Sequence, residues 1–223
     1  FMSSEEITEV RLTPDPTADI YVHEIELGDI DGDGVPEIFA TPSDPNQSGE
    51  TQQGDVVMYQ YRDGAYRYQL IDHTDATHAK EILVADLDAN GISEVFSAVE
   101  AEKRGGEIVG QVEIRQFVIE DDTTVSHRVI ATLDDDAQLR FMMAHDFDGD
   151  GWQEIVIAPM NTGLFMLDSE DGGETYQVVQ IADGTGGFEH ASNILDQSGT
   201  GAYGLYVADD SNMKALYLYQ PTD

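Results

Sequence analysis

Three short acidic stretches carry oxygen-bearing side chains at a spacing that suits a bound cation. Each fits the template D-x-D-x-[DN]-G-x-x-E, in which acidic or amide side chains alternate, a glycine follows and a glutamate closes the stretch. The side chains that fit it are Asp29, Asp31, Asp33 and Glu37; Asp86, Asp88, Asn90 and Glu94; and Asp146, Asp148, Asp150 and Glu154. Alternate side chains of a tight loop can converge on one point, where a hard cation takes six to eight oxygen ligands.

This chemistry predicts three Ca²⁺ sites. The glycine permits a sharp backbone reversal, and the next backbone carbonyl, from Val35, Ile92 or Trp152, can add an oxygen. Mg²⁺ is less suited because it keeps more water and takes fewer protein oxygens. The glutamate closes each stretch at position nine, whereas an EF-hand closes at position twelve. A solvated Asp-Gly turn would explain one copy, but three copies on one template favour a cation site.

Runs of β-branched and aromatic residues flank each acidic stretch and predict strands rather than helices. The first aspartates of successive stretches lie 57 (29 to 86) and 60 (86 to 146) residues apart. Repeats of this length built from strands and turns are typical of solenoids and propellers. Because each unit divides into four short strands, the sequence predicts an all-β fold, a β-propeller with blades of four antiparallel strands.

A fourth unit is degenerate. Its loop offers Asn193, Asp196 and Ser198 without a closing acid, so metal binding there is left open. This unit has three predicted strands, while a spare strand, Ile7–Asp15, precedes the first unit. We expect that N-terminal strand to pair in the last blade and close a four-bladed ring, because closure protects sheet edges. The expected single domain is 1–223, with blades at about 20–72, 78–133, 138–183 and 188–220 plus strand 7–15.

The triplicated loop between adjacent strands resembles the FG-GAP/VCBS repeat family, whose repeats form the calcium-binding blades of integrin α-subunit propellers and of several microbial lectins and lyases. The resemblance spans roughly residues 20–210. It implies that the acidic and amide side chains of the three template loops are calcium ligands. Because this family serves adhesion, sugar binding and, as an accessory module, enzymes, the resemblance is specific for loop chemistry and fold rather than for function.

A second set of residues lies at the start of each unit. Six residues before the first template aspartate are His23, Lys80 and Arg140, with Gly187 in the fourth unit. Tyr21 and His190 are close in sequence. One interpretation is a polar ligand pocket on the face opposite the calcium loops, formed by Tyr21, His23, Lys80, Arg140 and His190. The other is that Lys80 and Arg140 pair with surrounding carboxylates.

Composition narrows the classes of partner. The 223-residue chain has 45 Asp and Glu against 10 Lys and Arg, for a net charge of −35, so it repels nucleic acid and anionic membranes. The acid surplus has two open interpretations, cation ligands and a solvated acidic surface as in proteins from salty habitats. The chain has no cysteine, so disulfides and thiolate metal sites are excluded. No apolar run is long enough to insert into a membrane.

These features favour a calcium-stabilised, non-catalytic β-propeller that binds carbohydrate or protein outside the cell, in the periplasm or at the cell surface, although the sequence contains no signal peptide. We expect a monomer. One alternative is a lyase-like, polysaccharide-active enzyme that uses the face opposite the calcium loops. Another is a structural module of a larger secreted protein. No catalytic residue is assigned, because no nucleophile motif, triad spacing or phosphate loop occurs.

Overall fold

Alternating apolar and polar residues fold the chain into antiparallel sheets. The computed structural model describes residues 10–12, 20–45, 47–120, 124–188, 190–196, 199, 201, 203–211 and 215–219. These residues form 17 strands and no helix, which confirms the all-β prediction. Accordingly, no described helix is of a length and hydropathy that would cross a membrane.

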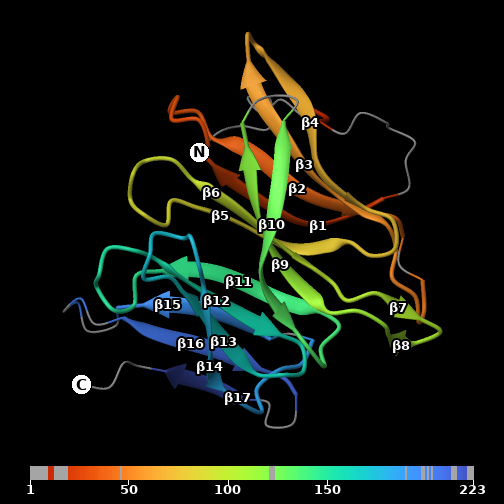
Figure 1. The fold of residues 1–223 in the computed structure, drawn as a ribbon, viewed down its shortest axis with the longest axis vertical. Coiled ribbons are helices and arrows are strands. Elements are labelled where there is room, and N and C mark those ends of the chain that lie inside the picture. The colour runs from red at the N-terminus through yellow and green to blue at the C-terminus, as the bar shows by residue number, and fades with distance from the viewer. Residues whose placement is uncertain are drawn as a thin grey trace, which may run out of the picture.

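Two four-stranded sheets occupy the N-terminal half (Figure 1). The first contains β1 (Tyr21–Gly28), β2 (Glu37–Ser43), β3 (Gly54–Arg62) and β4 (Ala65–Thr74), in that order. The second contains β5 (Ala79–Ala85), β6 (Glu94–Val99), β9 (Val112–Ile119) and β10 (Val125–Leu133), in that order. Between β6 and β9 the chain adds a small hairpin of β7 (Lys103–Arg104) and β8 (Glu107–Ile108).

Two further sheets follow. The third contains β11 (Leu139–His145), β12 (Glu154–Pro159), β13 (Leu164–Asp168) and β14 (Gln177–Ala182), in that order. The fourth contains β15 (Ala191–Leu195), β16 (Gly204–Asp209) and β17 (Ala215–Tyr219). Figure 1 shows the sheets following one another along the long axis, and β1 contacts β5, β5 contacts β11 and β11 contacts β15.

Apolar side chains fill the three spaces between successive sheets. Phe39 and Met58 of the first sheet pack with Ile82 of the second. Phe96 of the second sheet packs with Leu139 and Ile155 of the third. A smaller cluster joins the third and fourth sheets and includes buried Val156, Leu164, Leu205 and Val207. Burying these faces is the main source of stability in such an array, and it fixes the position of the loops at both ends of the sheets.

The described residues do not form the expected closed ring. The predicted N-terminal strand, 7–15, lies outside the described residues except for 10–12, which belong to no strand. Leu12 packs against the cluster of Ala40, Val57 and Tyr59 on the first sheet. The pairing of this segment with the last sheet stays a prediction, and Leu12 covers an outward face of the first sheet.

Both end sheets keep apolar residues exposed on their outward faces. Ile25 and Leu27 of β1 are 62% and 59% exposed, and they are cross-strand neighbours of Ala40 and Ile38. On β17, Leu216 and Leu218 are 72% and 44% exposed. A ring closed by contact between these two sheets would bury such residues, so their exposure agrees with the open array in Figure 1.

Candidate metal sites and the opposite face

The acidic loops connect the first and second strands of their sheets, so they lie at one end of the array, as the left of Figure 1 shows. Each first aspartate organises its loop by accepting two backbone N–H groups. Asp146 Oδ1 accepts from Gly149 at 2.6 Å, and Asp146 Oδ2 accepts from Gly151 at 3.1 Å. The two glycines have φ of 80° and 94°, a conformation that side chains disfavour.

The first and second loops repeat this arrangement. Asp29 accepts from Gly32 and Gly34, both at 2.8 Å. Asp86 accepts from Asn90 at 2.9 Å and from Gly91 at 2.8 Å. The template spacing therefore has a local structural cause, because the two carboxylate oxygens of the first aspartate hold the loop backbone in a tight curve.

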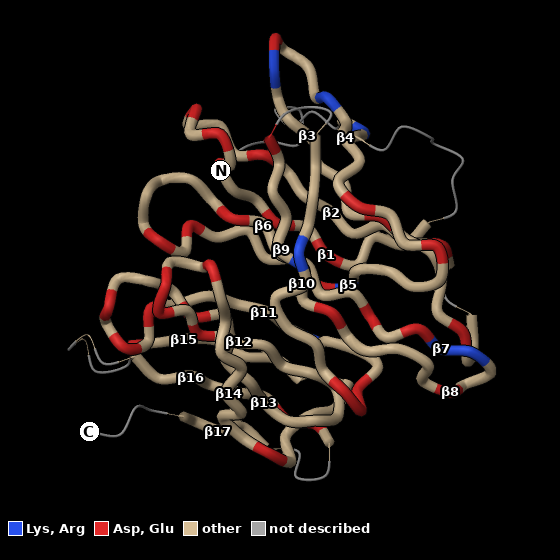
Figure 2. The backbone as a smooth tube through the Cα atoms, viewed as in Figure 1, with Lys and Arg blue, Asp and Glu red and all other residues tan. Residues whose placement is uncertain are grey.

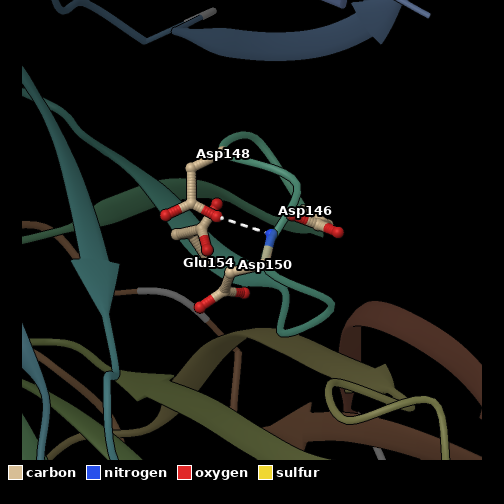
Figure 3. A group of neighbouring side chains, drawn as sticks. All are labelled: Asp146, Asp148, Asp150 and Glu154. Atoms are coloured by element: carbon tan, nitrogen blue, oxygen red, sulfur yellow. Dashed lines mark hydrogen bonds between the residues drawn. The ribbon is translucent and has the colours of Figure 1, made fainter.

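The third loop gathers the largest group of carboxylates. Asp146, Asp148, Asp150 and Glu154 each offer an oxygen, and these oxygens lie within 4.8 Å of one another. Figure 3 shows Asp148, Asp150 and Glu154 converging inside the loop, with Asp150 N–H donating to Asp148 Oδ1 at 3.0 Å. Unpaired carboxylates this close repel one another, so the cluster can hold a metal ion, and its all-oxygen donor set fits a hard cation.

The first loop gathers three of its four predicted acids. Asp29, Asp31 and Glu37 lie within the same 4.8 Å limit, and Asp33 is outside the group. Asp33 Oδ1 instead accepts from Val35 N–H at 2.7 Å. Arg62 Nη2 also reaches Asp31 Oδ2 at 2.9 Å, so a protein cation already neutralises part of this site.

The second loop keeps the backbone arrangement without gathering its carboxylates to the same extent. Asp86, Asp88 and Glu94 are all described but do not form a group within 4.8 Å. Asn90 Nδ2 donates to Asp88 Oδ2 at 2.8 Å, which ties two of the predicted ligands to each other. A cation there would have to replace that hydrogen bond.

The residues expected to offer backbone carbonyls follow the third polar position of each loop. The N–H groups of Val35, Ile92 and Trp152 donate at 2.7 Å to the side chains of Asp33, Asn90 and Asp150 respectively. Trp152 is half-buried and packs against the core between the second and third sheets. The carbonyl ligand role of these three residues stays a prediction.

The closing glutamates sit deeper than the aspartates. Glu37 and Glu154 are 3% and 2% exposed. Glu154 Oε2 accepts from Phe147 N–H at 2.7 Å, yet burial, together with the nearby Asp148, Asp168 and Asp146, raises the pKa of Glu154 to about 7. Burial likewise raises the pKa of Glu37 and of Glu94. A bound cation would reverse this effect by stabilising the ionised form.

The fourth loop has the same first aspartate as the other three, one whose carboxylate accepts two backbone N–H groups. Asp196 accepts from Gly199 and Gly201, both at 2.7 Å, so it is the counterpart of the first template aspartate. Asn193, predicted as a loop ligand, lies in β15 opposite Tyr206, so that prediction is wrong. Ser198 lies outside the described residues, and the closing position is occupied by Gly204. This loop has lost its closing acid.

When Asp196 is taken as the first aspartate of the fourth loop, all four units have a basic residue or a histidine six positions before that aspartate. The residue six positions before it is His190, where the sequence reasoning had placed Gly187. The four units therefore carry His23, Lys80, Arg140 and His190 at one position. The glycine pair after Asp196 was the sequence signal that would have revealed this alignment.

The structure brings three of these four residues together. The His23 ring stacks on the His78 ring at 4.7 Å between centroids, and its Nε2 lies 2.8 Å from Ser43 Oγ. Burial, followed by the charges of His78, Lys80 and Arg140, lowers the pKa of His23 to about 4. His23 is therefore a neutral side chain beside two cations.

Protein groups already contact both cations. Lys80 Nζ lies 3.6 Å from Glu100 Oε1. Arg140 Nε donates to the Phe188 carbonyl at 2.8 Å, and its guanidinium carbon lies 4.3 Å from the Phe188 ring centroid. The carboxylate-pairing interpretation therefore describes Lys80, whereas Arg140 is held by an aromatic ring and a carbonyl.

The two remaining candidates lie in different environments. Tyr21 is 51% exposed. His190 is 1% exposed and directs Nδ1 at the Pro159 carbonyl, 2.6 Å away. The structure records no hydrogen bond or ring contact that joins either residue to His23, Lys80 or Arg140. Of the five predicted ligand residues, the structure thus brings His23, Lys80 and Arg140 together, and a common ligand pocket for all five stays a prediction.

A pair of acids beside the basic residues was missed at the sequence level. Glu24 and Glu81 are hydrogen-bonded to each other, and Glu24 Oε2 also accepts from Ile82 N–H at 2.6 Å. Burial raises the pKa of both carboxyls, and their mutual proximity adds to the rise at Glu81. Each of the two acids directly follows a residue of the basic set, His23 or Lys80, and this shared position in the sequence could have indicated the pair.

An apolar pocket of about 320 Å³ opens between the third and fourth sheets. Its lining is Phe147, Asp148, Glu154, Met166, Asp168, Ile181, Leu205 and Tyr219. Two of these residues, Asp148 and Glu154, belong to the third acidic cluster, so this pocket adjoins that candidate metal site.

Comparisons with known proteins give a likeness of fold. No protein-family model and no curated protein matches the sequence. Among solved structures, rhamnogalacturonan lyase PL11 of Bacillus licheniformis resembles this chain with a TM-score of 0.51 at 16% sequence identity. The match covers 83% of this chain, which spans 39% of the lyase chain. At that identity the likeness concerns the fold alone.

Proposed function

We propose that this chain is a calcium-stabilised, non-catalytic β-sheet repeat module of the FG-GAP/VCBS type that binds carbohydrate outside the cell. The observation that carries the proposal is the third loop, where four carboxylates from one template converge within 4.8 Å. The recurrence of the same aspartate anchor at Asp29, Asp86 and Asp196 supports a repeated site rather than a chance acidic turn.

The same proposal assigns the four sheets as blades of a β-propeller. Support comes from the face-to-face packing of successive sheets and from the contacts between their first strands, β1 to β5, β5 to β11 and β11 to β15. Propeller blades share this arrangement, in which each blade leaves only short, protected edges.

The carbohydrate ligand is proposed over a protein ligand because the structural neighbour is named for a rhamnogalacturonan, a polysaccharide. Calcium is proposed over magnesium because the third loop supplies several protein carboxylates at one point, whereas magnesium usually keeps several waters. The ions would be held by the loop carboxylates and would stabilise the folded chain without taking part in chemistry.

Calcium removal tests the proposal. A site filled at a hundred times its dissociation constant adds about 2.7 kcal/mol to the free energy of unfolding, and each kcal/mol shifts the melting temperature of a chain this size by about 2–4 °C. We expect millimolar calcium to raise the melting temperature by several degrees over EDTA. An unchanged melting temperature would contradict the calcium assignment.

A single substitution tests whether the third loop binds one of the calcium ions that raise the melting temperature. Asp148→Ala should remove one calcium ion from the stoichiometry measured by titration calorimetry and reduce the thermal shift, because Asp148 lies inside the third cluster. Glu170→Ala is the matched control, since Glu170 is an exposed acid outside the loops. Equal stoichiometry in the two variants would place the ion elsewhere.

A lyase-like enzyme is the second candidate. It is favoured by Lys80 and Arg140 lying near the neutral imidazole of His23, because a cation can neutralise a uronate while an unprotonated imidazole takes a proton. The test is release of unsaturated product from pectic rhamnogalacturonan in the presence of calcium. Product formation by the wild type that Lys80→Ala abolishes would support the enzyme and overturn the non-catalytic proposal.

A further inference from the structure

Two long connections meet at the end of the sheets opposite the acidic loops. Residues 44–53 join β2 to β3, and residues 100–111 join β6 to β9 and include the β7–β8 hairpin at the right of Figure 1. The corresponding connection of the third sheet contains only residues 160–163. The first two units therefore carry an elaboration that the repeat itself does not need.

Hydrogen bonds lock the two connections together. Gly106 N–H donates to the Gly49 carbonyl at 2.7 Å, and Gly105 N–H donates to Glu50 Oε1 at 2.7 Å. Lys103 N–H donates to Thr51 Oγ1 at 3.0 Å. These contacts join two units of the repeat into a fixed wall.

Behind this wall lies a polar pocket of about 250 Å³. Its lining is Gln47, Gly49, Glu50, Thr51, Gln52, His78, Glu100, Lys103, Gly106 and Gln138. The set contains no aromatic ring except that of His78 and no aliphatic core residue. Ligand pockets usually measure roughly 300–1,000 Å³, so this one suits a small polar molecule.

The deepest polar groups of the pocket are His78 and Glu100, which are 2% and 3% exposed. His78 Nδ1 lies 3.2 Å from the Gln52 carbonyl, and since a carbonyl can only accept, Nδ1 carries the hydrogen. His78 Nε2 then presents a lone pair. It is buried and has no hydrogen-bond partner in the described protein.

Glu100 has a similar unmet acceptor. Its Oε2 accepts from Gln138 Nε2 at 3.2 Å, but its Oε1 is buried without a hydrogen-bond partner and lies 3.6 Å from Lys80 Nζ. His78 Nε2 lies 3.8 Å from Oε2 of the same carboxylate, so the unpartnered nitrogen is a close neighbour of the Glu100 carboxylate group. Buried acceptors without donors are unfavourable, so the pocket is suited to a molecule that donates neighbouring hydrogen bonds.

We propose that this pocket binds one sugar unit, whose neighbouring hydroxyls donate to His78 Nε2 and Glu100 Oε1. Two adjacent acceptors match vicinal hydroxyls, and they disfavour an anionic group at the same point. The inference rests on the proposed carbohydrate-binding function and assigns it a site that differs from the predicted five-residue pocket, sharing no residue with it.

The test is a titration of the calcium-saturated protein with methyl α-L-rhamnoside and methyl β-D-galactoside up to about 10 mM, a range that detects millimolar affinity. We expect at least one of them to bind. His78→Asn keeps an N–H near the position of Nδ1 and removes Nε2, and Glu100→Gln replaces one acceptor by a donor. Each should weaken binding about tenfold or more, the effect of losing one buried hydrogen bond.

The matched control is His190→Asn. His190 has the same kind of carbonyl contact and an equally unpartnered Nε2, but it lies outside the pocket. Its variant should bind like the wild type. In the wild type, the imidazole nitrogen resonances of His78 should shift during the titration and those of His190 should not, which gives a readout that does not depend on variant folding.

Absence of binding by both glycosides overturns the proposal, as does equal binding by His78→Asn and the wild type. Ethanolamine is an amine probe, and preferential binding of it would also overturn the sugar assignment. The metal loops lie at the other end of the sheets, so the melting temperature in calcium and EDTA is an independent measurement. A calcium shift without sugar binding rejects the pocket alone, and sugar binding without a calcium shift rejects the calcium sites alone.

Discussion

Buried carboxyl groups in this chain occur in two settings. Glu154 is buried among other acids of a loop that suits a cation, and burial, followed by the charges of those acids, raises its pKa. Half-buried Glu24 and buried Glu81 face each other between the first two sheets, near Lys80 and Arg140. In the first setting a bound metal ion would relieve the repulsion, and in the second a retained proton does.

The Glu24–Glu81 pair makes stability depend on pH. Burial raises the pKa of Glu81 from 4.5 to about 9, so the folded protein binds more protons than the unfolded chain between these values. The free energy of unfolding should then fall as pH rises from about 5 to about 9. Glu81→Gln should flatten this slope and raise stability at the alkaline end by roughly 1–3 kcal/mol, since one pKa unit is worth about 1.4 kcal/mol.

The measurement is urea denaturation in saturating calcium at several pH values. Glu170→Gln is the control, because Glu170 is exposed and should leave the slope unchanged. Parallel slopes for the wild type and Glu81→Gln would show that this carboxyl titrates alike in both states.

At the scale of single elements, tight turns set the register of the strands. Gly163 ends the connection between β12 and β13 with φ of 99°, and a Cβ there would lie 2.2 Å from the Ala182 carbonyl oxygen of β14. Gly64 in the β3–β4 turn has φ of 82° and open space around the same position. Both positions require a positive φ, but only at Gly163 would a side chain also clash. Comparing substitutions at the two positions therefore distinguishes the free-energy cost of the backbone conformation from that of the clash.

Gly163→Ala should therefore destabilise more than Gly64→Ala. Gly64→Ala adds only the left-handed backbone cost of about 1 kcal/mol. Gly163→Ala adds overpacking against β14, worth about 1–3 kcal/mol more. The comparison is made from denaturation midpoints at constant calcium. Equal midpoints would mean that β14 moves away from the turn at no cost.

At the scale of the whole molecule, acidic residues occur in all four large sheets. Figure 2 shows acidic positions along the chain from top to bottom, with basic positions concentrated at the upper sheets and the β7–β8 hairpin. Three calcium ions would change the net charge only from −35 to −29, by −35 + 6. The remaining repulsion favours expansion of the chain.

Salt should stabilise the calcium-saturated protein. Screening shortens the range of charge interactions from about 10 Å at 0.1 M to about 3 Å at 1 M ionic strength. The melting temperature should rise over this range, and KCl should act like NaCl because screening does not depend on the ion. A flat response would show that the acidic side chains are too far apart or too well solvated to destabilise the fold. A continued rise in molar salt would favour the salty-habitat interpretation.

The sequence by itself determined the all-β class and the positions of the acidic loops. These features are local, because alternation specifies strands and the Asp-Gly spacing specifies a turn in which one carboxylate accepts two N–H groups. Asp29, Asp86 and Asp146 could be identified without tertiary information for this reason. Misalignment of the fourth loop hid that Asp196 is the counterpart of the first template aspartate and, with it, that His190 lies six positions before it.

Tertiary structure alone decided which residues of different units meet. Glu24 reaches Glu81 and His78 lies beside Glu100 because successive sheets pack at a fixed offset that no single unit encodes. It also decided that Leu12 packs on the outward face of the first sheet. An apolar strand pattern specifies a buried face, but which partner covers that face depends on the competition among all the sheets in the folded chain.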